Sequence, residues 1–216
     1  MATWDWTGNT NSAWDGANNW LLDGVPTASH PTGNLPGDIV RLGVVALSRT
    51  IATGPASPTI IAELDVIRLG YFNPPPAMHV MWANLTVATL VVEGHPQGNE
   101  CTMTEGTVTG RLIVKGPPAF SIKGGVIGGT IEVFTDNSGP FLITDSTDEA
   151  GSIIFNNVTI KVYGRLHMDG SGYMMQGSAV VKPMRKSARI TTTGWMPNLT
   201  IDPVDVQPMS RALSVG

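Results

Sequence analysis

Short runs rich in Val, Ile and Thr, separated by Gly, Asn and Pro, are the feature that most limits what this chain can fold into. These runs extend from Thr59 to about Val181, and they are typical of many short strands joined by turns. No window of a dozen residues has apolar residues at helical spacing and also lacks Gly and Pro. The sequence therefore predicts an all-β protein.

Four of the runs can be aligned on one valine each, namely Val92, Val114, Val133 and Val162, with separations of 22, 19 and 29 residues. A charged residue lies beside each aligned valine, which indicates apolar side chains pointing inward and polar ones outward at period two: Glu93, Lys115, Glu132 and Lys161. Such strands bury their apolar face by stacking on neighbouring coils. We therefore expect a short parallel β-solenoid (β-helix), with an antiparallel sandwich or jelly roll as the alternative.

The repeat divides the chain into three segments. Residues 1–40 are rich in tryptophan and form an expected N-terminal cap or arm, residues 41–181 form the solenoid body, and residues 182–216 form an irregular C-terminal arm. Neither terminal segment fits the repeat.

Composition excludes several classes of protein. Only 14% of the residues are charged and the formal net charge is -4, so nucleic acid is not an expected partner. Every hydrophobic run is shorter than the roughly 18 apolar residues of a membrane helix, and the first residues lack the basic and apolar parts of a secretory signal. The single cysteine, Cys101, excludes an intrachain disulfide, and we expect its thiol to be inert.

The N-terminal segment carries the most specific motifs in the chain. In order they are Trp4-Asp5-Trp6-Thr7-Gly8, Trp14, Asn19-Trp20, Gly24-Val25-Pro26 and Gly37-Asp38-Ile39-Val40. This order resembles the segment that opens many β-helical surface proteins, including autotransporter-type passenger domains. The resemblance covers about 40 of the 216 residues and implies a β-helix fold with a surface role.

Two roles are open for the rings of Trp4, Trp6, Trp14 and Trp20. They can seal the end of the solenoid, where apolar side chains and strand edges need cover, with nearby Asp and Asn accepting from the indole N–H groups. Alternatively, these rings, or Trp82 and Tyr71, form an aromatic platform for sugars. The first role needs buried rings and the second needs exposed ones.

Glycan-cleaving enzymes are common on β-helices and act through a pair of carboxylates, so such a pair is the feature that would indicate this activity. Four candidates lie in or beside the loop from Thr135 to Gly151, in a composition typical of a solvated turn: Asp136, Asp145, Asp148 and Glu149. A second set, Asp65, Glu93 and Glu132, could recur on one face of successive coils, but Arg111 and Lys115 interrupt it. We therefore expect no catalytic site and no enzymatic activity.

Motifs for cofactors and metals are also missing from the sequence. The four histidines, His30, His79, His95 and His167, lack a second ligand at metal-binding spacing. The glycine-rich run 124–129 has no following lysine or helix, so it is not expected to cradle phosphate, and we interpret it as tight turns flanking a strand. No cofactor and no metal is expected.

The basic cluster Lys182, Arg185, Lys186 and Arg189 is the remaining candidate for interaction. Such a run is often merely solvated, but it could meet an acidic neighbour or a phosphate. We expect it to mark the exit from the solenoid into an arm that reaches a neighbouring subunit.

The absence of chemistry and of a secretory signal favours a virion component made in the host cytoplasm. In size and composition the chain is similar to tailed-phage capsid decoration (cement) proteins and fibre modules. This similarity implies a homo-oligomer, most simply a homotrimer, that binds the major capsid protein or other virion subunits. The alternatives are a carbohydrate-binding or host-adhesion module that binds surface glycans and, less favoured, a polysaccharide-degrading tailspike fragment.

Overall fold

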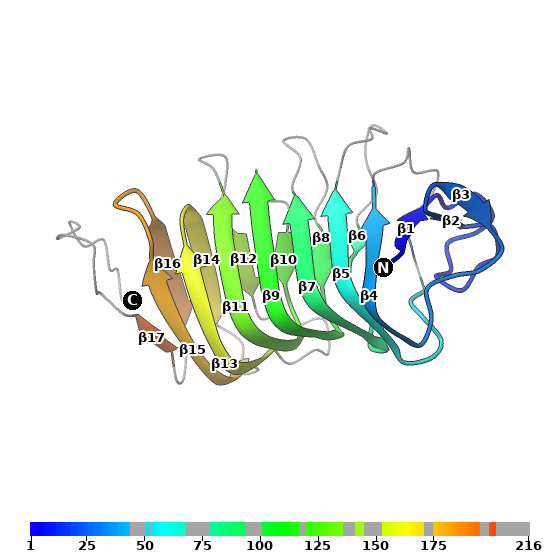
Figure 1. Ribbon diagram of the computed structural model, residues 1–216. Coiled ribbons are helices and arrows are strands. Elements are labelled where there is room, and N and C mark those ends of the chain that lie inside the picture. The colour runs from blue at the N-terminus through cyan, green and yellow to red at the C-terminus, as the bar shows by residue number, and fades with distance from the viewer. Residues whose placement is uncertain are drawn as a thin grey trace.

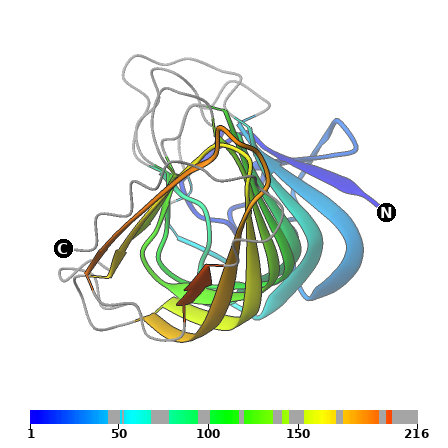
Figure 2. The same cartoon turned by 90° about the vertical axis from the view of Figure 1, so that its left-hand side faces the viewer.

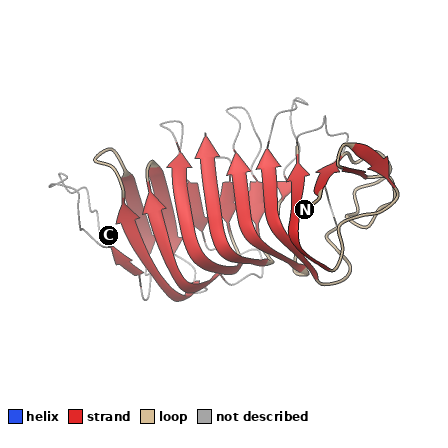
Figure 3. Cartoon of the chain, viewed as in Figure 1, coloured by secondary structure: helices blue, strands red, loops and turns tan. Residues whose placement is uncertain are grey.

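The computed structural model describes residues 1–43, 51, 53–67, 78–93, 101–116, 120–135, 141–144, 153–170, 175–194 and 199–201. Within these residues the chain is all-β, with strands β1 to β17 and no helix (Figure 3). The predicted fold class is confirmed at this level.

The strands form two sheets. In spatial order, the large sheet contains β17 (Leu199–Ile201), β15 (Met175–Pro183), β13 (Ile153–Val162), β11 (Gly125–Thr135), β9 (Thr107–Gly116), β7 (Leu85–Glu93), β5 (Thr59–Ile67), β4 (Asn34–Leu42), β1 (Thr3–Trp6), β2 (Trp20–Leu22) and β3 (Val25–Thr27). The small sheet contains β16 (Arg189–Gly194), β14 (Arg165–Gly170), β12 (Phe141–Thr144), β10 (Phe120–Ile122), β8 (Cys101–Met103) and β6 (Met78–His79).

Successive strands alternate between the sheets from β5 to β17, so each sheet grows by one strand for every return of the chain. Every pair among β4 to β17 in the described chain is parallel, whereas β1 with β2 and β2 with β3 are antiparallel. Figures 1 and 2 show the large sheet extending from the N-terminal strands to β17, with the small sheet behind it. From β4 onward, the strands of each sheet therefore lie in space in the same order as in the sequence.

The register confirms the alignment of the four valines. Val92 is the partner of Val114, Val114 of Val133, and Val133 of Val162. The same row extends to Val66 on β5, which is the register partner of Val92. A period-two pattern in the sequence therefore predicts which side chains lie side by side in the sheet.

A second row, two residues earlier on each strand, forms the centre of the core. Its members are fully buried: Val40, Leu64, Leu90, Leu112, Ile131, Ile160 and Val181. Burying one such side chain contributes about 1.5–3 kcal/mol relative to leaving it exposed. Because each member packs against residues of neighbouring strands, no strand can keep this energy when separated from the others.

Irregularities in register recur near the same point of successive strands. Shifts occur between Leu35 and Ile39, Val87 and Thr89, Gly128 and Thr130, and Phe155 and Val158. At one of them, Gly129 adopts φ +71, and a side chain there would collide with the carbonyl of Gly110. This corrects our interpretation of run 124–129 as flanking turns, because residues 125–129 lie within β11 and Gly129 lies at a bulge that bends the strand.

Regular structure extends across both expected segment boundaries. The first parallel strand, β4, begins at Asn34 and so includes the boundary at residue 40. At the other end, β15 runs through residue 182, and β16 and β17 add one further strand to each sheet. Up to residue 201, the described part of the expected C-terminal arm therefore belongs to the sheets except for the turn at 184–188, and its Ile190 and Leu199 pack on the core.

The core row generates a direct stability test. Replacing Leu112 with Ala should lower the free energy of unfolding by about 2–5 kcal/mol, because it leaves a cavity in the central row. Replacing the neighbouring Ile113, which points outward and is half-buried, should cost about 1 kcal/mol or less. Urea unfolding followed by circular dichroism measures both values, and equal losses would contradict the assignment of faces.

Candidate functional site

The four N-terminal tryptophans gather in one buried cluster. Trp6, Trp14 and Trp20 expose at most 1% of their surface and Trp4 exposes 7%. The rings of Trp6 and Trp14 each meet the ring of Trp20 edge-on, at centroid distances of 5.0 and 4.9 Å. Such T-shaped pairs are a favoured geometry for aromatic rings.

The fifth member of this cluster comes from the middle of the chain. Trp82 lies just before β7, and its ring centroid is 5.6 Å from that of Trp14. It is 8% exposed and packs directly against Gly54, where a side chain would strike the indole ring. Sequence reasoning treated Trp82 as a sugar-stacking residue, but the structure brings it into the tryptophan cluster.

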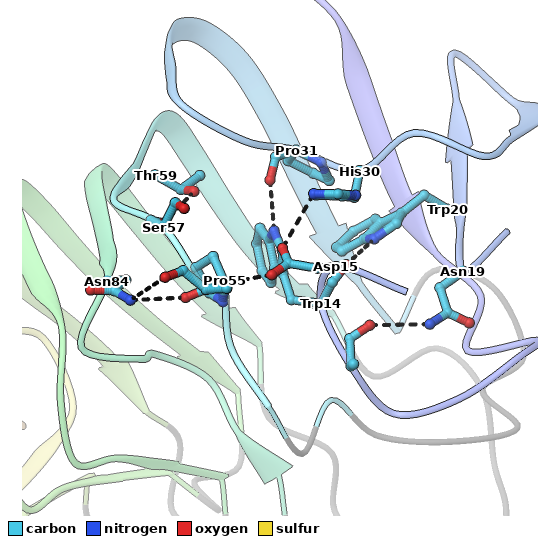
Figure 4. A network of polar contacts seen from close by, with 12 residues as sticks. Trp14, Asp15, Asn19, Trp20, His30, Pro31, Pro55, Ser57, Thr59 and Asn84 are labelled. Atoms are coloured by element: carbon cyan, nitrogen blue, oxygen red, sulfur yellow. Dashed lines mark hydrogen bonds and ion pairs between the residues drawn. The ribbon is translucent and has the colours of Figure 1, made fainter. Parts of the chain in front are cut away.

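Hydrogen bonds fix the orientation of these rings (Figure 4). The indole N–H of Trp14 donates to the carbonyl of Pro31 at 2.7 Å, and that of Trp20 donates to the carbonyl of Trp14 at 2.8 Å. The Trp4 N–H donates to the Asp38 carboxylate at 3.1 Å. Two of the three acceptors are backbone carbonyls, and the third is an aspartate of the Gly-Asp-x-Val motif.

A polar network ties the cluster to the segments that precede β5 and β7. Asp15 lies 3.3 Å from His30 and accepts a hydrogen bond from the backbone N–H of Ala56 at 2.8 Å. The Asn84 amide donates to the carbonyls of Pro55 and Ala56 at 3.1 and 3.2 Å (Figure 4). The N-terminal segment is thus connected through residues 53–59 to the turn that precedes β7.

The burial of the rings bears on the two roles open for them. A sugar platform needs an exposed flat face, and neither the four N-terminal tryptophans nor Trp82 presents one. Tyr71, the other residue considered for sugar stacking, lies outside the described residues. Buried rings are what an end cap requires, and the indole N–H groups of Trp4, Trp14 and Trp20 also have acceptors, whereas the buried one of Trp82 has none among the described residues.

The basic cluster lies at the turn from β15 to β16. All four side chains, Lys182, Arg185, Lys186 and Arg189, are exposed. The turn is closed by a hydrogen bond from the N–H of Ala188 to the carbonyl of Arg185, and the N–H of Arg189 donates to Gly164. Arg185 and Lys186 therefore lie in a hydrogen-bonded turn, and Lys182 and Arg189 lie on the strands that flank it.

Two aromatic side chains missed by sequence reasoning lie beside this cluster. Phe134 and Tyr163 stack nearly parallel, with centroids 4.4 Å apart and planes 10° apart. The guanidinium of Arg185 lies 5.5 Å from the Tyr163 ring centroid, a cation–π contact. The signal was present in the sequence, because Phe134 and Tyr163 each follow one of the aligned valines.

Pairing across β14 and β16 adds a further cation. Arg165 is the register partner of Arg189, and paired residues of parallel strands point to the same face. Arg165 thus lies on the same corner as the cluster, although sequence reasoning did not include it.

The outer face of the large sheet carries a carboxyl pair on β5. Glu63 and Asp65 are two residues apart and so share one face of the strand. Burial and then the Glu63 carboxyl raise the pKa of Asp65 to about 6, while Arg41 and Lys115 act in the opposite direction. On the β7 side the register partners are the uncharged Thr89 and Val91.

Arg41 is held on its other side by Asp5. Its Nε and Nη2 donate to the two Asp5 oxygens at 2.6 and 2.7 Å, a bidentate geometry that fixes both side chains. Because Asp5 already binds two donors of Arg41, the positive charge of Arg41 lowers the pKa of Asp65 too little to offset burial and Glu63. Chemically, the Asp65 carboxyl can bind and release a proton near its raised pKa of about 6.

The structure separates the carboxylates that sequence reasoning grouped together. Glu132 accepts from Arg111 at 2.7 Å and lies 3.7 Å from Lys161, so cations neutralise it. Glu93 lies in a different row from Asp65, opposite Lys115. The loop candidates Asp136, Asp145, Asp148 and Glu149 lie outside the described residues.

The histidines are dispersed over the described chain. His30 contacts Asp15, His167 lies 2.8 Å from the Thr191 hydroxyl, and His79 belongs to β6, while His95 lies outside the described residues. No three His, Cys, Asp or Glu side chains gather into a metal-binding group among the residues that the structure describes. Cys101 begins β8.

Comparison of this chain with protein-family models, with curated protein sequences and with solved structures finds no match. Among the described residues, no helix has the length and apolar character needed to cross a membrane.

The carboxyl pair predicts a pH-dependent stability. A raised folded-state pKa means that Asp65 binds a proton more tightly in the folded state than in the unfolded state. Its stabilising contribution to the free energy of unfolding is therefore fully present below about pH 4 and is lost as the pH rises through about 6. Replacing Asp65 with Asn should therefore stabilise the protein at neutral pH by on the order of 1 kcal/mol, allowing for solvent screening.

Urea unfolding of both proteins between about pH 4 and pH 8 measures this effect. The advantage of the Asp65→Asn variant should shrink towards the acidic limit. Glu93→Gln is the control, because it also removes a carboxylate but does so on the neighbouring strand. A pH-independent difference between wild type and Asp65→Asn would refute the assignment.

Proposed function

We propose that the two sheets are the faces of a short parallel β-solenoid in which each coil supplies one strand to each sheet. The alternation of strands between sheets and the parallel pairing from β4 onward support this architecture. A sandwich of antiparallel strands would need antiparallel neighbours in the body. In the described chain such pairs occur only among β1, β2 and β3.

On this solenoid we propose a non-enzymatic role as a virion structural protein, a capsid decoration (cement) subunit of a tailed phage. The observation that carries the proposal is the N-terminal cap. Its motifs are the most specific in the sequence, and its tryptophans are buried. The indole N–H groups of Trp14 and Trp20 donate within the N-terminal segment, and the backbone N–H of Trp14 donates to the carbonyl of Thr53 in the body. The motifs that resemble β-helical surface proteins therefore support a structural function.

The mechanism of such a subunit is adhesive. A stiff body of stacked strands can span the joint between two shell subunits, and many copies on one particle add their separate affinities. In this proposal the chain is made in the host cytoplasm, assembles as a homotrimer and binds the major capsid protein. No cofactor, metal or nucleic acid takes part.

A carbohydrate-binding or host-adhesion module is the second candidate. The observation that favours it is the Phe134–Tyr163 stack, because Phe134 is 36% exposed and lies beside exposed cations. Acidic surface glycans would suit such a site. A glycan array with wild type and Phe134→Ala tests this candidate, and an array without hits eliminates it.

The decoration role predicts saturable binding to capsids. Shells assembled from the major capsid protein of the same genome are mixed with purified chain and sedimented through a sucrose gradient. We expect the chain to co-sediment in a fixed ratio to shell protein and to raise the temperature at which the shells break.

The control is an unrelated protein of similar size, which should remain at the top of the gradient. Deletion of residues 1–20 is a poor test, since it removes four buried tryptophans and with them the fold. Folded chain that fails to bind intact shells at any concentration would refute the decoration role.

A further inference from the structure

Charge is distributed unevenly along the chain. Residues 1–152 hold 14 acidic and 6 basic side chains, whereas residues 153–216 hold 3 acidic and 7 basic ones. The last third of a chain with net charge -4 is therefore basic. Because strands are stacked in chain order, this difference between segments becomes a difference between the two ends of the molecule.

The described residues show the same separation. Up to residue 67 they include one arginine, Arg41, and six carboxylates: Asp5, Asp15, Asp23, Asp38, Glu63 and Asp65. From residue 153 to residue 201 they include one carboxylate, Asp169, and six cations: Lys161, Arg165, Lys182, Arg185, Lys186 and Arg189. We call these two regions the acidic end and the basic end, and Figure 1 shows them at opposite limits of the large sheet.

Exposed apolar side chains accompany the charges. The large hydrophobic residues that the described chain exposes fall into two groups, with Met1, Val25 and Ile60 at the acidic end and Phe134, Met184 and Ile201 towards the basic end. Val25 and Ile201 belong to β3 and β17, the two edge strands of the large sheet. Apolar residues among charged ones are typical of protein interfaces.

The basic end is ordered before any partner binds. Arg185 lies over Tyr163, and the turn that carries it is closed by backbone hydrogen bonds. Among the described residues, no carboxylate forms an ion pair with Arg185, Lys186 or Arg189. These cations can therefore accept an acidic partner with little loss of conformational freedom.

The acidic end is also held in place. Asp23 is exposed and accepts a hydrogen bond from the backbone N–H of Thr3 at 2.8 Å, and Asp15 is fixed by His30 and Ala56. Glu63 lies half-exposed on the outer face of β5. The chain thus offers, at opposite ends, two surfaces of complementary charge that each include apolar residues.

We propose that copies of this chain associate head to tail, with the basic end of one copy bound to the acidic end of the next. Like ends repel and unlike ends attract, so charge selects the orientation. Contacts of this kind are heterologous, and they produce a closed ring, such as a trimer, or an open row, depending on the rotation between copies. The inference concerns the purified chain alone and stands apart from any role in a virion.

Sedimentation velocity of the full chain at low and high salt gives the first test. At low ionic strength we expect the mean mass to rise with protein concentration, and at about 0.5 M NaCl, where screening is strong, we expect monomer. A wild-type chain that is monomeric at every concentration in low salt would overturn the proposal.

Charge reversal gives the second test. Arg185→Glu with Lys186→Glu should weaken self-association by about tenfold or more, because repulsion replaces attraction. The control, Lys115→Glu with Lys123→Glu, changes the net charge equally in the middle of the molecule and should associate like wild type. Circular dichroism confirms that each variant is folded.

A complementary swap identifies the partner surface. Asp23→Lys with Glu63→Lys should also weaken self-association, and mixing this variant with Arg185→Glu/Lys186→Glu should restore association between the two variants. Since reversed ends are again complementary, we expect the mixture to form heterodimers that neither variant forms alone. If only the basic-end variant loses association, or if the mixture stays monomeric, head-to-tail contact is refuted.

Discussion

The inward rows of Val, Leu and Ile are the interaction on which the rest of the structure depends. Each member of the central row, such as Leu90 or Leu112, is buried by its counterparts on the strands either side of it. A single strand of this pattern cannot bury its own apolar face, so the strands become stable only together. Register shifts recur at several strand pairs of the large sheet, and at the one on β11 Gly129 lies so close to the neighbouring strand that a side chain would not fit.

A row of this kind has two ends, and the two ends of this protein differ. At the N-terminal end the core includes a cluster of tryptophans, of which Trp14, Trp20 and Trp4 donate to Pro31, Trp14 and Asp38 respectively. At the other end the described part of the large sheet finishes with β17, which carries the exposed Ile201. The first of these ends is acidic and the second is basic, and this difference in charge underlies our proposal of head-to-tail association.

Parts of this arrangement could be predicted from residue types and spacing. The valine alignment predicted the register of β7, β9, β11 and β13, since one inward position per strand is enough to set which residues are partners. It also contained the Phe134–Tyr163 stack, although that consequence was missed. The position of Trp82 against Trp14 could not be predicted, because 68 residues separate them in the sequence and no pattern links them.

The sequence by itself determined that the chain is all-β and which residues face inward. It also determined that the most specific motifs lie in a tryptophan-rich N-terminal segment and in a basic segment near residues 182–189. Tertiary structure alone decided that the tryptophan rings are buried, that Arg185 and Lys186 lie in the turn between β15 and β16, and that burial and Glu63 raise the pKa of Asp65 beside Arg41. The reason is physical: alternation along a strand is a local property, whereas burial, cation–π contacts and pKa values depend on which distant segments are brought alongside.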